Sequence, residues 1–190
     1  MAYKHVCPWW IGYFLASPLR RLLVDPARIL GPYVHAGATA LDVGPGMGFY
    51  TLPLARLVGE GGRVVAVDLQ ERMLASLARR ARRAGLAGRI ETRLCRTDSL
   101  SIDDLEGKVD FALVMYMAHE VPDKHGLFAQ LSRALAPGGV ILLAEPRGHV
   151  SEKAYAGTLD IARASGLEPS DGPRLSRGLT SLLRGQAPSL

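Results

Sequence analysis

The sequence predicts an α/β fold in which a doubly wound, mostly parallel sheet of seven strands carries helices on both faces. Three observations lead to this prediction. From residue 38 onward, short apolar runs alternate with segments that carry apolar residues at helical spacing. The runs are almost wholly apolar, which is typical of parallel strands that are buried on both faces. The last two runs have no helix between them, so we expect them to pair as an antiparallel hairpin at the end of the sheet.

The predicted elements follow one another without an internal repeat or a long polar linker. The helix expected at residues 71–84 places its apolar residues on one face and ends at Gly85. A later helix is expected to end at Pro137 and Gly138. The predicted strands cover residues 38–43, 63–67, 89–95, 109–115 and 140–144, and the predicted helices cover residues 49–58, 71–84, 123–135 and 152–164. The hairpin is expected near residues 167–174 and 179–184.

Length and composition favour one main domain. The chain has 190 residues, of which 48% are hydrophobic, and this is enough for a sizeable core. Residues 1–37 precede the alternating pattern, and four prolines divide them into short helical pieces. We expect these residues to form a helical lid that packs over the sheet or its mouth. Residues 38–190 are then expected to form the main domain.

Cysteine content and hydropathy bear on the compartment of the protein. The two cysteines, Cys7 and Cys95, lie far apart in the sequence, which indicates neither a disulfide framework nor a paired metal site. Free cysteines suit a reducing cytoplasm, so we expect a cytoplasmic protein without a metal. The apolar stretch at residues 6–17 is about half as long as a membrane span, and it lacks a clearly basic start. Neither a transmembrane segment nor export is predicted.

The most informative segment joins the first predicted strand to the first predicted helix, from Leu41 to Phe49. Its glycines allow positive φ angles and let the backbone approach a ligand, while the helix N-terminus offers unpaired N–H groups to an anion. A dinucleotide-binding loop uses the same physics, but it needs a small residue three positions after its second glycine. Here Gly44 and Gly46 place Phe49 at that position, and Gly48 comes one residue too early. These details argue against a dinucleotide.

The second predicted strand ends at Asp68. In nucleotide-binding folds, an acid at this position accepts hydrogen bonds from the ribose hydroxyls. Asp68 therefore supports the binding of a nucleoside. The same residue also suits a helix N-cap, because a helix is expected to start at Glu71. Both interpretations stay open at this point.

At these residues the sequence resembles the class I S-adenosylmethionine-dependent methyltransferases. The first motif of that family has an acid followed by glycines at alternate positions, as in Asp42, Gly44, Gly46 and Gly48. Three further segments resemble the later motifs of the family, in the same order: Val67-Asp68-Leu69, Cys95-Arg96-Thr97-Asp98-Ser99 and Leu135-Ala136-Pro137-Gly138-Gly139. The resemblance implies that residues 38–190 form a methyltransferase domain. The broad type is similar to the ubiquinone-biosynthesis and metalloid-methylating branches.

The resemblance also implies which residues hold the cofactor, S-adenosylmethionine. The family binds the methionine end of this cofactor near the glycine loop and its adenosine along the ends of the second and third strands. An acid after the third strand bonds the adenine amino group. The implied cofactor-binding residues are Asp42, Gly44, Gly46, Gly48, Asp68, Leu69, Asp98, Ser99 and Met115.

The acceptor side of such an enzyme has little covalent chemistry to perform. It must hold the acceptor in line with the methyl group, exclude water and remove a proton where the acceptor carries one. Tyr116, His119 and Glu120 follow the fourth predicted strand, at the carboxyl edge of the sheet, and are the candidate catalytic residues. His119 is a candidate general base, with Glu120 orienting it or acting itself. Alternatively, the His-Glu pair stabilises the loop and caps the next helix.

The N-terminal segment is unusually aromatic, with Trp9, Trp10 and Tyr13 close together. We expect these residues to form an apolar lid over the acceptor. Two other interpretations stay open. The segment could lie at a membrane surface, with Arg20 and Arg21 facing anionic headgroups. It could also be a helix that packs as core.

The predicted partner is a small-molecule acceptor rather than a nucleic acid. The net charge is +5, and the basic run that includes Arg79, Arg80, Arg82 and Arg83 reads as the solvated face of a helix, without interleaved aromatic residues. The sequence lacks the (N/D)PP(Y/F) motif of base-amine methylation and the Pro-Cys nucleophile of pyrimidine-carbon methylation. Two alternatives remain: an RNA or protein methyltransferase, and a non-catalytic nucleoside-binding protein on the same fold.

Overall fold

The structure is a computed structural model that describes residues 24–185. In these residues, seven strands form one mixed sheet in the order β3-β2-β1-β4-β5-β7-β6, which confirms the predicted doubly wound fold class. The strands are β1 (Thr39–Val43), β2 (Arg63–Asp68), β3 (Ile90–Leu94), β4 (Val109–Met115), β5 (Leu135–Pro146), β6 (Leu167–Asp171) and β7 (Gly178–Gly185). The helices are α2 (Pro26–Leu30), α3 (Thr51–Leu57), α4 (Glu71–Arg83), α5 (Lys124–Ala134) and α6 (Glu152–Ala164).

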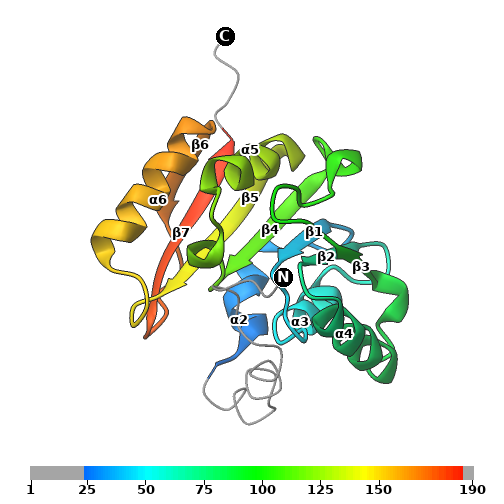
Figure 1. The fold of residues 1–190 in the computed structure, drawn as a ribbon. Helices are drawn as coiled ribbons and strands as arrows, with labels where there is room; N and C mark the ends of the chain where they lie inside the picture. The colour runs from blue at the N-terminus through cyan, green and yellow to red at the C-terminus, as the bar shows by residue number, and fades with distance from the viewer. Residues whose placement is uncertain (1–23, 186–190) are drawn as a thin grey trace. The chain divides into compact units, whose positions relative to one another are not determined.

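The chain divides into two compact units, which meet in the sequence between Cys95 and Arg96. In the N-terminal unit, β1, β2 and β3 run parallel, and α4 packs on β2 and β3 (Figure 1). Strand β2 is buried from Val64 to Val67, as its continuous apolar run predicts. The short helix α2 packs on α3 and begins with a proline, behind an Asp25 side chain that caps it.

In the C-terminal unit, β4 and β5 run parallel, while β7 is antiparallel to both β5 and β6. The chain passes from α6 to the edge strand β6 and returns as β7, so the predicted hairpin is confirmed. Helices α5 and α6 pack on each other, and α6 covers β6 and β7 (Figure 1). Phe111 of β4 and Phe128 of α5 are completely buried in this unit.

Strand β5 begins earlier than the sequence predicts. The helix before it ends at Ala134, and Leu135 already pairs with Val109. The register of β4 and β5 then shifts, so Pro137 and its two glycines form an irregular bulge rather than a helix stop. Gly139 is needed there because a Cβ atom would lie 2.6 Å from the Val109 carbonyl oxygen.

Candidate functional site

Strand β1 runs into a loop in which three alternate glycines take the left-handed conformation. The φ angle is 70° at Gly44, 54° at Gly46 and 85° at Gly48. The Gly44 amide donates a hydrogen bond to the Val67 carbonyl oxygen at 2.9 Å, which fixes the start of the loop to β2. Other residues rarely take such angles, so this backbone favours glycine at each of these positions.

Gly46 and Gly48 have different surroundings. A Cβ atom at Gly48 would clash with Leu77 Cδ1, because the loop packs directly against α4. Gly48 therefore permits the close helix packing that a dinucleotide loop obtains one position later. A Cβ atom at Gly46 would have no atom within 4 Å, so this position faces open space. Arg80 of α4 donates to the Met47 carbonyl oxygen at 2.5 Å and holds the loop on the helix.

Asp68 ends β2 and lies beside the open position of the glycine loop. Its Oδ2 accepts a hydrogen bond from the Gly46 amide at 3.3 Å, and its Oδ1 accepts one from the Gln70 amide at 2.8 Å. Asp68 and Leu69 are half-buried. The loop and this carboxylate fit S-adenosylmethionine, because a backbone open at Gly46 permits close approach and an acid beside it suits ribose hydroxyls.

Asp42 is buried within the N-terminal unit, with 2% of its surface exposed. Thr51 Oγ1 donates to Asp42 Oδ2 at 2.6 Å, at the start of α3. Burial raises the pKa of Asp42 to about 7; the Thr51 hydrogen bond lowers it, and the Asp68 charge raises it. The structure thus gives this carboxyl an internal partner, and its contact with a cofactor stays a prediction.

Asp98 and Ser99 lie in the turn that follows β3, within the C-terminal unit. Arg96 holds the Asp98 carboxylate through two hydrogen bonds, Nε to Oδ1 at 3.0 Å and Nη2 to Oδ2 at 3.2 Å. These bonds lower the pKa of Asp98, whose side chain is exposed. Ser99 Oγ accepts a hydrogen bond from the Ser101 amide at 3.1 Å. The adenine contact expected of Asp98 stays a prediction.

The C-terminal unit changes conformation sharply where β4 ends. Met115 is buried, and Tyr116 takes a φ angle of 61°. A residue other than glycine holds such an angle at a cost of about 1–3 kcal/mol, and such residues cluster at functional sites. The Tyr116 amide donates to the Ala144 carbonyl oxygen at 2.8 Å. A Cβ atom at Gly178 would lie 3.3 Å from Tyr116 Oη, so the phenol lies against the start of β7.

His119 is fixed by a buried acid from the neighbouring strand. It lies on a short turn, Ala118–Glu120, and Glu145 is the second-last residue of β5. Glu145 Oε2 lies 2.6 Å from His119 Nδ1, and Oε1 accepts a hydrogen bond from the His119 amide at 2.9 Å. The side chain of Glu145 is 2% exposed and that of His119 is 27% exposed. The acid therefore holds both the backbone and the ring of His119, and it leaves the ring nitrogen Nε2 unengaged by this pair.

A second histidine flanks this pair. His149 lies in the turn after β5, and its ring centroid is 6.1 Å from that of His119, with an angle of 29° between the ring planes. Its amide donates to the Pro146 carbonyl oxygen at 3.0 Å. His149 is exposed. The carboxyl edge of β4 and β5 thus carries two neighbouring imidazoles, one of which is held by a buried carboxylate.

Sequence reasoning missed Glu145 and named Glu120 as the partner of His119. Glu120 is half-buried, but the carboxylate that pairs with the imidazole nitrogen Nδ1 is that of Glu145. One signal was available: Glu145 directly follows the apolar run of residues 140–144 that predicts a strand. A carboxylate at the end of a buried strand needs a partner that offsets its desolvation.

Tyr155 of α6 lies on the buried side of this cluster. Burial raises its pKa to about 12; Ser181 lowers the pKa, and the charge of Glu145 raises it. Ser181 faces the hydroxyl without a hydrogen bond of normal geometry, so the Tyr155 hydroxyl has no such partner among the described residues. The two residues therefore extend the polar cluster toward α6 and β7.

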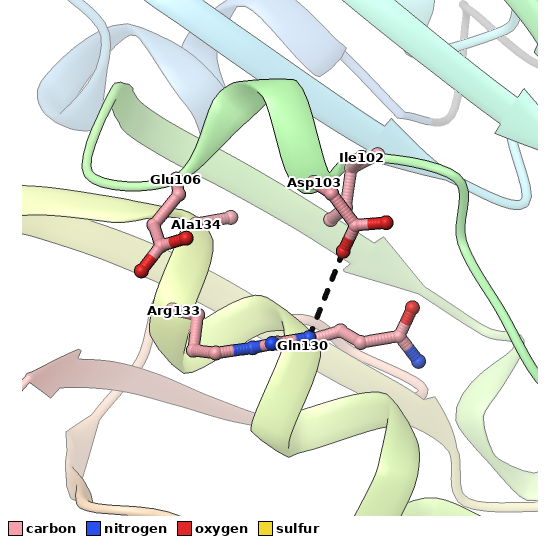
Figure 2. A pocket seen from close by; sticks show the side chains of 6 residues that line it. All are labelled: Ile102, Asp103, Glu106, Gln130, Arg133 and Ala134. Carbon is pink, nitrogen blue, oxygen red and sulfur yellow. Dashed lines mark ion pairs between the residues drawn. The ribbon is translucent and has the colours of Figure 1, made fainter.

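A small hollow in the C-terminal unit lies away from these groups (Figure 2). It is lined by Ile102, Asp103, Glu106, Gln130, Arg133 and Ala134. Arg133 and Asp103 face each other at 3.7 Å (Figure 2). Glu106 shortly precedes β4 and Ala134 directly precedes β5, so the hollow lies at the amino ends of these strands. Ligands of parallel sheets bind at the carboxyl ends, so we do not assign the site to it.

The remaining expectations concern the aromatic N-terminal residues, the two cysteines, a metal site and a membrane span. Trp9, Trp10, Tyr13 and Cys7 lie outside the described residues. Burial raises the pKa of Cys95 to about 11, with a further increase from the charge of Asp68, which makes the thiol a poor nucleophile at neutral pH. Residues 24–185 contain no group of three or more metal-binding side chains that could hold an ion. Within the same residues, no helix is long and apolar enough to span a membrane.

The basic run on α4 is partly engaged within the N-terminal unit. Arg79, Arg82 and Arg83 are exposed, as a solvated helix face predicts. Arg80 is half-buried and bonded to the glycine loop. These positions give no specific support to an RNA-binding surface.

Comparison with known proteins supplies the family. The model of the methyltransferase domain family matches residues 40–139, which include the glycine loop, Asp68 and His119. The chain belongs to this methyltransferase family. The expected family and the expected cofactor, S-adenosylmethionine, are confirmed.

A curated relative of this methyltransferase domain is a C-methyltransferase of quinone biosynthesis. The ubiquinone/menaquinone biosynthesis C-methyltransferase UbiE of Escherichia coli is 33% identical over 112 residues, which is 59% of this chain and 44% of that enzyme. The chain therefore matches less than half the length of that relative.

Solved structures show the same fold. An S-adenosylmethionine-dependent methyltransferase from Aquifex aeolicus is similar with a TM-score of 0.82 and 23% identity, over 94% of this chain and all of that one. Geranyl diphosphate C-methyltransferase from Streptomyces coelicolor gives a TM-score of 0.65 and 25% identity, over 80% of this chain and 63% of that one.

Proposed function

We propose that this methyltransferase domain transfers the methyl group of S-adenosylmethionine to a small-molecule acceptor, and that His119 removes the proton of that acceptor. The family and the two C-methyltransferase relatives support the first part. The second part rests on one observation, the hydrogen bond of 2.6 Å between His119 Nδ1 and the buried Glu145.

The glycine loop and Asp68 are proposed to hold the cofactor. Gly44 and Gly46 let the backbone approach it, while Asp68 bonds the ribose hydroxyls. Leu69, Asp98, Ser99 and Met115 are assigned to it only through the family resemblance. When bound, S-adenosylmethionine supplies an electrophilic methyl group on a positively charged sulfur.

His119 is proposed to act through Nε2. The buried carboxylate of Glu145 favours the tautomer that donates a proton from Nδ1, because an ionised carboxyl group only accepts hydrogen bonds. Nε2 then carries a lone pair and can take a proton from a hydroxyl, an amine or an acidic carbon of the acceptor. Glu145 stabilises the imidazolium that forms, and it keeps the ring in place during transfer. Tyr116 is the second candidate at this edge, because its strained backbone presents the phenol beside β7.

Three wider assignments also remain proposals. Residues 1–37 are proposed as a lid, with Trp9, Trp10 and Tyr13 against the acceptor. A cytoplasmic location is proposed from cysteine usage. Peripheral contact with a membrane remains an alternative role for the aromatic segment.

The test combines a turnover assay with a binding assay. Methyl transfer from labelled S-adenosylmethionine is followed on a fractionated small-molecule extract, and calorimetry measures the affinity for S-adenosylhomocysteine. His119→Gln is expected to lower kcat by about 10²–10⁴-fold, the usual contribution of a general base, while cofactor affinity stays unchanged. His125→Gln, at an exposed histidine of α5, is the matched control and should leave kcat unchanged.

Two results would contradict this proposal. Unchanged turnover of the His119 variant would remove its role as a base. Cofactor binding without transfer to any fraction would favour the non-catalytic alternative.

A further inference from the structure

The acceptor side of the C-terminal unit includes a third loop, residues 172–177, which joins β6 to β7. Strand β7 is antiparallel to β5, and Gly178 pairs with Pro146, so this loop ends at the same edge as Glu145. The Arg147 amide donates to the Arg177 carbonyl oxygen at 3.0 Å, which joins the loop to the turn that carries His149. The loop therefore lies beside the imidazole cluster.

Internal hydrogen bonds hold the backbone of this loop in place. Thr180 Oγ1 donates to the Pro173 carbonyl oxygen at 2.7 Å, and the Gly178 amide donates to the Leu175 carbonyl oxygen at 3.2 Å. The loop is thus anchored at both ends and near its middle. Side chains on such a backbone are held in position more firmly than on an unsupported loop.

Arg174 and Arg177 differ from the other arginines of this unit. The other five each bond a side chain within the described residues: Arg96 with Asp98, Arg133 with Asp103, Arg147 with Glu152, Arg163 with Asp160 and Arg184 with Ser170. Arg174 and Arg177 are exposed and have no such partner in the described part of the chain. The loop that is joined to the His149 turn therefore carries two arginines without a side-chain partner among the described residues.

We propose that the acceptor carries an oxyanion, a carboxylate or a phosphate, which Arg174 and Arg177 bind next to His149. A guanidinium group matches such an anion through paired N–H donors. The pair suits one small anion better than a nucleic acid, which needs several phosphate contacts and base-stacking aromatic side chains. The third arginine of this edge, Arg147, is already neutralised by Glu152 at 2.9 Å.

This inference names the substrate class of the proposed methyltransferase and so rests on that function. The cofactor carboxylate does not account for the two arginines, because the family resemblance assigns it to the glycine loop of the N-terminal unit. An anion on the acceptor is a ligand of suitable charge for them. The group would orient the acceptor and would not take part in methyl transfer itself.

The test titrates the whole chain with pyrophosphate and, separately, with benzoate, and follows the histidine ring signals by NMR. The His149→Asn variant identifies one of these signals. At least one probe is expected to shift the His149 signal, and the better probe shows which oxyanion is preferred. The double variant Arg174→Gln/Arg177→Gln should weaken that binding at least tenfold.

The matched control is Arg133→Gln/Arg163→Gln, which removes two exposed charges elsewhere in the same unit. It should bind the probe like the unaltered chain. Equal weakening in both double variants, no weakening in either, or no binding of either probe would overturn the proposal. Binding of a single-stranded RNA without binding of either probe would also overturn it.

Failure of the proposed function has a different signature. In that case S-adenosylhomocysteine does not bind, or no fraction is methylated, whatever the anion titration shows. The anion titration needs no turnover, so the two hypotheses fail separately.

Discussion

Asp42 and Glu145 are buried carboxyl groups near the carboxyl ends of β1 and β5. Their hydrogen-bond partners differ. Glu145 pairs with the backbone amide and the imidazole of His119, whereas Asp42 accepts a hydrogen bond from the neutral hydroxyl of Thr51. A neutral donor offsets less of the desolvation of a carboxylate than a charged or doubly bonding partner does. The pKa of Asp42 is accordingly raised to about 7.

This shift predicts an unusual dependence of stability on pH. The folded-state pKa of Asp42 lies above its ordinary value of 3.8, so between about pH 4 and pH 7 the folded chain binds more protons than the unfolded chain. Asp42 therefore lowers the free energy of unfolding as pH rises through this window, by at most about 1.4 kcal/mol per pH unit. Asp42→Asn keeps an acceptor for Thr51 and should remove this contribution.

Urea unfolding at several pH values measures the effect. The exposed Asp98, whose pKa is lowered, provides the control variant Asp98→Asn, which should not remove that loss of stability. The same pH slope in the Asp42→Asn variant and the unaltered chain would show that the buried carboxyl does not titrate in this range.

The buried hydroxyl of Tyr155 leads to a prediction about stability: its removal should not destabilise the fold. Because it is buried without a hydrogen bond of normal geometry, its removal takes nothing favourable away. Tyr155→Phe should leave the free energy of unfolding unchanged or raise it by up to about 1 kcal/mol. Thr158→Val on the same helix should lower it by about 1 kcal/mol, because the Thr158 hydroxyl bonds Ala154 and Lys124. Chemical denaturation compares them, and a clear loss in the Tyr155 variant would reveal a partner for that hydroxyl.

At the scale of the elements, two glycines of the glycine loop are expected to affect different properties, Gly48 the stability of the fold and Gly46 the binding of the cofactor. Both Gly46 and Gly48 have positive φ angles, so alanine strains either position by about 1–2 kcal/mol. Only at Gly48 does the new methyl group also meet Leu77. At Gly46 it enters the open space proposed for the cofactor.

Gly48→Ala should therefore lower the melting temperature more than Gly46→Ala does. Gly46→Ala should weaken the binding of S-adenosylhomocysteine more than its small effect on stability explains. Each variant is the control for the other in thermal unfolding and calorimetry. Equal effects of the two variants on affinity would mean that the space beside Gly46 is not the cofactor site.

The elements also show where sequence patterns succeed and fail. The predicted strand at 109–115 coincides with β4, an almost wholly apolar run that follows Gly107 and Lys108. The start of β5 was missed because Pro137-Gly138-Gly139 usually ends a helix. Here the segment is absorbed by a shift in strand register, which depends on the neighbouring strand and not on local sequence.

At the scale of the whole molecule, the doubly wound fold and its antiparallel end were predictable from the sequence, whereas the details of the site were only partly so. The glycine loop and Asp68 are neighbours in the motif pattern, and the structure brings them together through the Gly46 amide. The His119–Glu145 pair spans 26 residues and forms only because β4 and β5 are adjacent. Glu120, next to His119 in the sequence, was the natural but local choice.

The proposed lid leads to the last prediction. Every residue assigned to the cofactor lies at Asp42 or later, so deletion of residues 1–17 should leave a folded domain that binds S-adenosylhomocysteine. Turnover should fall by far more than affinity, because the acceptor would lose its cover. If Trp9 and Trp10 instead belong to the core, their removal would cost several kcal/mol, a large part of the stability of a domain. Thermal unfolding and cofactor titration of the shortened chain distinguish these cases, and an insoluble chain or a much lower melting temperature would refute the lid.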